Sequence, residues 1–118
     1  MKPEFFKSPT EFRKWLEKNH EKEDEIWVGM FKKASGKVGI NYDQALDEAL
    51  CYGWIDGILK KYDEVSYIQR FTPRRHKSNW SRINKGHVER LIKEGKMMSS
   101  GFKAVEEAKK DGRWEKNA

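Results

Sequence analysis

The feature that most constrains the fold is a hydrophobic pattern whose period changes several times along the chain. After the capping box SPTE at residues 8–11, apolar residues recur at helical spacing, which predicts a helix over about residues 9–20. Residues 26–31 are instead apolar on both alternating faces, a pattern typical of a central strand buried on both sides. Helices and strands therefore alternate within this chain.

Turn and capping residues divide the middle of the sequence. Residues 34–37 have turn chemistry, and Asn41 with Gln44 predicts a second helix that Gly53 ends in a left-handed conformation. Residues 57–61 and 65–71 then predict a β-hairpin around Tyr62-Asp63-Glu64, which Pro73 ends.

The last part of the chain predicts two helices. The first begins at Ser78 or Asn79, ends at Gly95 and carries an apolar stripe of Trp80, Ile83, His87, Val88 and Leu91. The second begins at Ser99 or Ser100, ends at Gly112 and turns Phe102, Val105 and Ala108 inward. The resulting order is α-β-α-β-β-α-α, so we expect an α+β fold with about three antiparallel strands and about four helices.

Composition limits the broad class of the protein. The 118 residues fit one domain, residues 1–118, and five Trp, six Phe and four Tyr are enough to form a core. No apolar run suits a membrane span or a secretion signal, so we expect a cytoplasmic protein without membrane insertion. The single cysteine excludes a disulfide framework and a cysteine-based zinc site.

Positive charge is concentrated in one segment. The chain has 25 basic and 19 acidic residues, a net charge of +6. Residues 70–96 hold nine Lys and Arg side chains against two glutamates, so the rest of the chain is close to neutral. This distribution favours an anionic partner, although a solvated helix face would produce the same pattern.

Six short runs cover nearly the whole chain. They are WVG (27–29), KKASGK (32–37), ALDEALCYGWIDG (45–57), QRFTPRR (69–75), KSNWS (77–81) and DGRW (111–114). Their order and spacing resemble the YdeI/OmpD-associated family of bacteria, also called the bacteriocin-protection family. The resemblance implies a link to tolerance of bacteriocins or antimicrobial peptides, and it implies no reaction. Longer members continue after the DGRW run, so this chain is a short member or the front part of a longer protein.

The residue types needed for catalysis or metal binding do not fall into a known pattern. Cys51 lies near the end of a predicted helix, where the helix dipole disfavours a thiolate, so we expect a buried structural cysteine. His20, His76 and His87 do not have zinc-ligand spacing. Glycine-rich phosphate loops and a nucleophile elbow are also absent from the sequence. We therefore expect no metal, no cofactor and no enzyme activity.

The candidate site combines arginine forks, the predicted start of a helix and aromatic faces. It consists of Arg70, Arg74, Arg75, Ser78, Asp56, Tyr67 and Trp80. Asp56 is expected to pair with the arginines, either as a structural contact or to orient one of them toward a ligand. The alternative interpretation places Trp80 in the core, Ser78 in a cap and the arginines in solvent or in internal pairs.

These observations favour a non-catalytic binding or stress-tolerance module with a basic surface that binds anions. The alternative is a nucleic-acid-binding protein that uses residues 70–96 and stacks bases on aromatic side chains. An enzyme that acts on an anionic small molecule would need Asp56 as a base in an open cleft beside the arginines. A module that works only when docked to another protein would expose an apolar patch.

Overall fold

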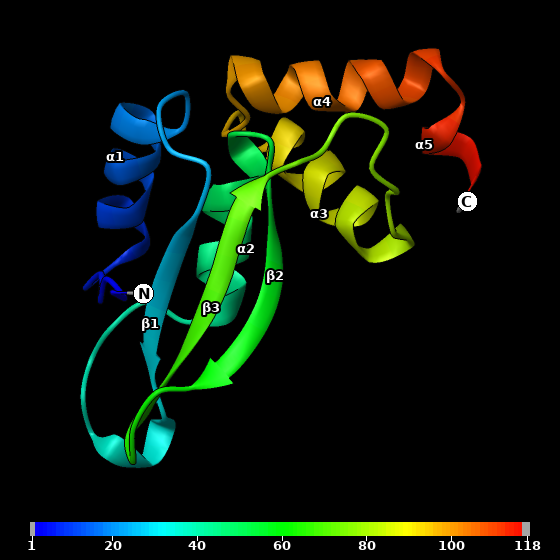
Figure 1. Ribbon diagram of the computed structural model, residues 1–118. Helices are drawn as coiled ribbons and strands as arrows, with labels where there is room; N and C mark the ends of the chain where they lie inside the picture. Colours follow the sequence, from blue (N-terminus) through cyan, green and yellow to red (C-terminus); the bar gives the residue numbers. More distant parts are fainter. Residues whose placement is uncertain (1, 117–118) are drawn as a thin grey trace.

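The computed structural model describes residues 2–116, which form a three-stranded antiparallel sheet and the helices packed against it (Figure 1). The strands are β1 (Ile26–Phe31), β2 (Trp54–Lys61) and β3 (Ser66–Pro73). The helical elements are α1 (Pro9–Asn19), η1 (Lys33–Ser35), α2 (Tyr42–Cys51), α3 (Arg82–Lys93), α4 (Ser99–Lys110) and the short α5 (Arg113–Lys116). The predicted α+β class and element order are confirmed.

The position of β1 in the sheet differs from the prediction. It is buried on both faces, as its sequence indicates, but the strand order β1-β3-β2 places β3 in the centre. The outer edge of β1 is partly covered by the N-terminal segment, where the Glu4 amide donates to Trp27 O (2.9 Å) and the Gly29 amide donates to Glu4 O (2.8 Å). The same segment lays the ring of Phe5 over Gly29 and against Phe31, so it also covers one face of β1, which is why an edge strand has the apolar pattern of a central one.

The first two helices begin where their local sequence predicts. Ser8 accepts a hydrogen bond from the Glu11 amide, although the Glu11 carboxylate accepts from the amide of Lys7 rather than from that of Ser8. At α2 the capping box is complete, because Asn41 and Gln44 each accept from the other's backbone amide. Capping of this kind satisfies amide groups that the first turn of a helix leaves free.

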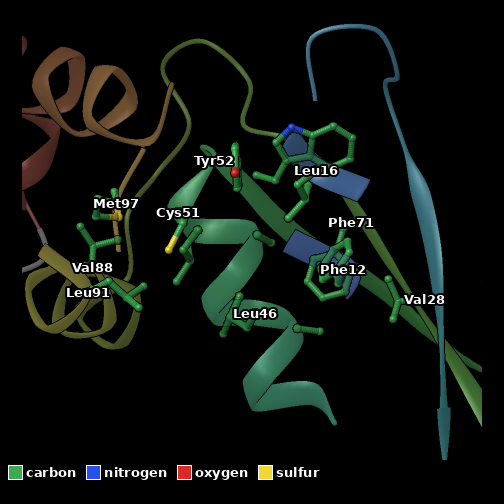
Figure 2. Packing of buried hydrophobic residues seen from close by; sticks show 14 of the residues in the cluster. Phe12, Leu16, Val28, Leu46, Cys51, Tyr52, Phe71, Val88, Leu91 and Met97 are labelled. Carbon is green, nitrogen blue, oxygen red and sulfur yellow. The ribbon is translucent and has the colours of Figure 1, made fainter. Parts of the chain in front are cut away.

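Helix α2 lies at the centre of the hydrophobic core. Its side chains contact α1 and the sheet on one side and the α3–α4 region on the other (Figure 2). Phe12 of α1 packs on Phe71 of β3 with 5.7 Å between ring centroids, and both are fully buried. Val88 and Leu91 are fully buried residues of the same cluster, contributed by α3. The helices α3, α4 and α5 gather at the end of the sheet where β3 ends (Figure 1).

The starts of α3 and α4 correct two predictions. Helix α3 is capped by Ser81 and not by Ser78 or Asn79, so Trp80 precedes the helix and does not set its apolar stripe. Ile83 is consequently 72% exposed, and the buried positions are Lys85, Val88 and Leu91.

Helix α4 has Met98 at its N-cap without a side-chain bond, so neither Ser99 nor Ser100 caps it. Phe102, which the sequence pattern turns inward, is 41% exposed, whereas Gly101, Val105 and Ala108 are buried.

A close contact joins the start of α4 to the end of α2. The Met98 amide donates to Cys51 O (2.9 Å), and Ser100 Oγ donates to Tyr52 O (2.9 Å). A Cβ atom on Gly101 would overlap the Cys51 carbonyl, so glycine permits this approach. Gly53 has a φ of +78°, which confirms the predicted left-handed end of α2. Together these contacts set the wall of a cavity.

Candidate functional site

A cavity of about 330 Å³ lies at the end of the sheet, between the turn after α2, the segment after β3 and α4. Its size falls at the lower end of the range for small-molecule sites. Four cationic side chains line it, against two carboxylates: the cations are Arg74, Arg75, Lys103 and Arg113, and the carboxylates are Glu21 and Glu107. We call this cavity the Arg74 pocket.

Arg74 is the most unusual side chain in the pocket. Its guanidinium lies 3.5 Å from the ring centroid of Trp80, and its Nη1 donates to Ser78 Oγ (3.2 Å) and to Asn79 O (3.1 Å). Its Nε and Nη2 are buried and have no hydrogen-bond partner among the described residues. Leaving buried polar N–H groups unpaired costs about 1–3 kcal/mol each, and more when the group is charged. Such groups point to an interaction that residues 2–116 do not supply.

A second guanidinium reinforces the positive charge. Arg113 Nε donates to the Asp111 carboxylate, and its Nη1 donates to Ser78 O (2.7 Å). Arg74 and Arg113 therefore hold the same residue, Ser78, one by its hydroxyl and the other by its carbonyl. The pKa of Arg74 is lowered to about 10, first by burial and also by the charge of Arg113, while the charge of Asp56 opposes the shift. Arg74 thus remains charged at neutral pH.

The structure brings together only part of the predicted site. Arg74, Arg75, Ser78 and Trp80 line the same pocket. Ser78 does not offer the start of a helix, because its amide donates to Arg75 O in a turn and α3 begins later.

Trp80 is 2% exposed and lies between Arg74 and Trp114, so it supports the guanidinium and has no free face for a ligand ring. It belongs to the hydrophobic core, as the alternative interpretation holds.

The other predicted site residues lie elsewhere. Arg70 Nε donates to Glu25 (2.7 Å), and its neighbours Gln69 and Phe71 face the opposite side of β3. Asp56 accepts from the Tyr42 hydroxyl (2.7 Å) and forms no ion pair with an arginine of the described chain. Asp56 and Tyr67 line a different pocket. The cleft that an Asp56-based enzyme would need beside the arginines is therefore not formed.

Residues distant in the sequence complete the Arg74 pocket. Arg113, Lys103 and His20 come from α5, α4 and the end of α1. The only sequence signal for Arg113 is the DGRW run, which contributes to the family resemblance but lies outside the basic segment of residues 70–96. His76 Nδ1 lies 3.7 Å from Glu107, an exposed contact at the pocket rim.

Three further properties bear on function. Among residues 2–116, no His, Cys, Asp and Glu side chains form a group of three or more that could hold a metal ion. None of the helices in that range has the length and apolar composition required to cross a bilayer. Burial raises the pKa of the Cys51 thiol, as expected for a structural cysteine.

Comparison with known protein families gives a match for the chain. The sequence profile described as Domain of unknown function (DUF8412) matches residues 4–104. The chain belongs to this family. The DUF8412 match includes Arg74, Ser78 and Trp80 but ends before Arg113, so the second guanidinium of the pocket lies outside it. No curated protein and no solved structure matches the chain.

Proposed function

We propose that the protein is a non-catalytic binding module that holds a small anion, a phosphate or carboxylate group, in the Arg74 pocket. The observation that carries this proposal is the pair of buried, unpartnered nitrogens on Arg74. A planar guanidinium suits two oxygens of one phosphate or carboxylate, and burial strengthens such a contact. Arg113 adds a second charge within reach of the same cavity.

A nucleic-acid partner has less support. Several of the basic side chains in residues 70–96 are already engaged: Arg70 with Glu25, Arg90 with Asp47, and Lys85 with the carbonyl of Trp114. Single-strand binding proteins also stack bases on exposed aromatic faces, whereas Trp80 is buried. The charge of the segment thus does not form an uninterrupted stripe along which a phosphate backbone would lie.

An amide-resolved NMR titration tests the proposal. The probes are inorganic phosphate, glycerol 3-phosphate and a short oligothymidylate, each added at low and at physiological salt. We expect saturable shifts at Ser78 and Gly53 with a small anion, retained at physiological salt. The absence of shifts with all probes would refute the proposal. Shifts with the oligothymidylate alone, lost at higher salt, would support nucleic-acid binding instead.

Matched arginine variants identify the residue responsible. Arg74→Gln should weaken small-anion binding by about tenfold or more, the size expected for a charged hydrogen bond. Arg70→Gln removes the same charge four positions earlier, from a residue outside the pocket, and should leave the affinity within about twofold. Circular dichroism verifies that both variants are folded. Equal losses in the two variants would show that only net charge matters, which would contradict a defined site.

The resemblance to the bacteriocin-protection family supplies a cellular setting for this proposal. We extend it to a cytoplasmic role in tolerance of bacteriocins or antimicrobial peptides. A strain that lacks the gene should become more sensitive to such peptides, and the wild-type chain should restore tolerance where Arg74→Gln does not. Unchanged sensitivity of the deletion strain would reject this role without affecting the binding result, and cell fractionation tests the location.

A further inference from the structure

A second pocket of about 460 Å³ lies between the start of α2 and the β2–β3 ladder. It is lined by Tyr42, Asp56, Gly57, Leu59, Tyr67 and Gln69, none of which lines the Arg74 pocket. We call it the Asp56 pocket. Its residues carry no cationic side chain, although the chain has a net charge of +6.

A β-bulge creates this pocket. Asp56 is paired with Phe71 and Leu59 with Gln69, so three steps along β2 correspond to two steps along β3. The extra residue brings Leu59 to the same face of the sheet as Asp56. Bulges often redirect side chains in this way beside functional sites. The carboxylate and the leucine side chain thus lie on one surface, opposite the aromatic residue at the start of α2.

Two side chains of the pocket, Tyr42 and Gln69, already use their hydrogen-bond donors within the chain. Tyr42 donates its hydroxyl hydrogen to Asp56 Oδ2 (2.7 Å). Gln69 donates its Nε2 to the carbonyl oxygens of Gly57 (2.6 Å) and Ile58 (3.3 Å). The acceptors that face a ligand are the carboxylate, the phenol oxygen of Tyr42 and the amide oxygen of Gln69, and the Tyr67 hydroxyl can accept or donate. A ligand that complements the three acceptors must supply donors.

Two carboxylates act on the pocket, and the cation beside it, Lys61 opposite Tyr67, lies 3.8 Å from the carboxylate of Glu64. Asp56 is half-buried in its wall, and the exposed Asp43 lies close enough for its charge to act on Tyr42. Arg74 acts on Asp56 only from a distance and forms no ion pair with it among the described residues. A carboxylate bonded to one tyrosine, with a second tyrosine in the wall of the same pocket, is a chemical environment that favours organic cations.

We propose that the Asp56 pocket binds an organic cation, an alkylammonium or guanidinium group, with Asp56 as its counter-ion. The N–H groups of the cation bond to the acceptor oxygens, and the alkyl chain packs on Leu59, which is 56% exposed. The rings of Tyr42 and Tyr67 add cation–π attraction. This inference is independent of the Arg74 pocket, since the two sites share no lining residue.

The test compares three probes that share a butyl chain and differ in their head group, each added to the full chain. n-Butylamine and n-butylguanidine carry the cation, and n-butanol is the neutral control. We expect saturable NMR shifts at the amides of Gly57 and Leu59 with the two cations and not with n-butanol. Equal shifts with n-butanol would show a merely apolar pocket, and no shifts with the cations would overturn the proposal. A short lysine-rich peptide then distinguishes a peptide side chain from a free amine as the source of the cation.

Two carboxylate variants make the test specific. Asp56→Asn keeps the shape of the side chain and an oxygen for Tyr42, and should weaken cation binding by about tenfold or more. Asp24→Asn removes the same charge from an exposed residue outside the pocket wall, and should change the affinity by less than about twofold. An amide spectrum that overlays on that of the wild type verifies folding. Unchanged binding in Asp56→Asn would refute the role of the carboxylate.

Discussion

Replacing Gly101 by alanine should destabilise the protein, while the same replacement at Gly86 should stabilise it. Both glycines lie within helices, at the start of α4 and in the middle of α3. On helix propensity alone, alanine is favoured over glycine by about 1 kcal/mol in a helix interior. The two positions differ in the space around them, and this difference reverses the sign of the effect.

The surroundings of each glycine set the magnitude. At Gly101 a Cβ atom would overlap the carbonyl oxygen of Cys51 and lie 2.8 Å from Met97 Cε, whereas nothing lies within 4 Å at Gly86. Overpacking against a fixed backbone costs about 1–3 kcal/mol. The overlap is with a backbone atom, so the upper part of this range applies, about 2–3 kcal/mol. After the gain of about 1 kcal/mol from propensity, we expect Gly101→Ala to lose about 1–2 kcal/mol and Gly86→Ala to gain about 0.5–1 kcal/mol. For a domain of this size that corresponds to roughly 4 °C of melting temperature per kcal/mol.

Urea unfolding followed by circular dichroism measures both effects. The midpoints should move in opposite directions, and the slope of the free energy of unfolding against urea should stay constant, which shows that the denatured state is unchanged. Gly86→Ala verifies that a gain in helix propensity is detectable. If Gly101→Ala is as stable as the wild type or more stable, the close approach of α4 to α2 does not limit this position.

Three further outcomes follow from single contacts. The pKa of Tyr42 is raised to about 12, first by burial and then by its bond to a carboxylate, so its contribution to stability is complete below pH 10 and is lost as the pH rises toward 12. Between about pH 10 and 12 the melting temperature should therefore fall less steeply with pH for Tyr42→Phe than for the wild type. Equal slopes in the two proteins would contradict this assignment. Ser81→Ala should cost about 1 kcal/mol by loss of the α3 cap, whereas Ser99→Ala, at a helix start whose cap makes no side-chain bond, should be close to neutral in the same urea assay. Cys51 is fully buried and its thiol pKa is raised by burial, so a thiol-specific disulfide reagent should label it only after unfolding, and rapid labelling of the native protein would show that the site opens.

Features encoded by neighbouring residues were predictable from the sequence. The caps at Ser8 and Asn41 depend on residues three positions away, and the left-handed Gly53 depends on a single backbone position. The apolar run predicted the bounds of β1 correctly, but it did not predict that β1 lies at the edge of the sheet. Strand order depends on pairing between distant residues, such as Ile26 and Phe71, which are 45 positions apart, and a local pattern does not encode it.

The predicted start of α3 was wrong because several residues in that stretch are good N-caps. Ser78, Asn79 and Ser81 have similar intrinsic preference for the position before a helix. Ser78 is instead held by Arg74 and by Arg113, the latter 35 residues later in the chain. The contact between Ser78 and Arg113 therefore helps to decide which serine becomes the cap. It also brings Arg113 to the wall of the Arg74 pocket.

The partner of Asp56 was missed for a related reason. Arginines follow on the neighbouring strand, so an ion pair was the natural expectation. In the sheet, Asp56 is paired with Phe71 and lies on the face where α2 packs, and Tyr42 at the start of that helix becomes its partner. Which face a side chain occupies depends on strand register, and register depends on the whole sheet.

The strand order has a consequence for the order of folding events. β2 and β3 are joined by a short turn in which the Asp63 carboxylate accepts from the Val65 amide and the Ser66 hydroxyl, so the hairpin closes only a small loop. β1 pairs with the far side of β3, and the chain between them includes α2 (Figure 1). Closing the larger loop costs more entropy, so β1 should join after the hairpin. We therefore expect changes at Asp63 to slow folding, and changes in β1 to act mainly by speeding unfolding.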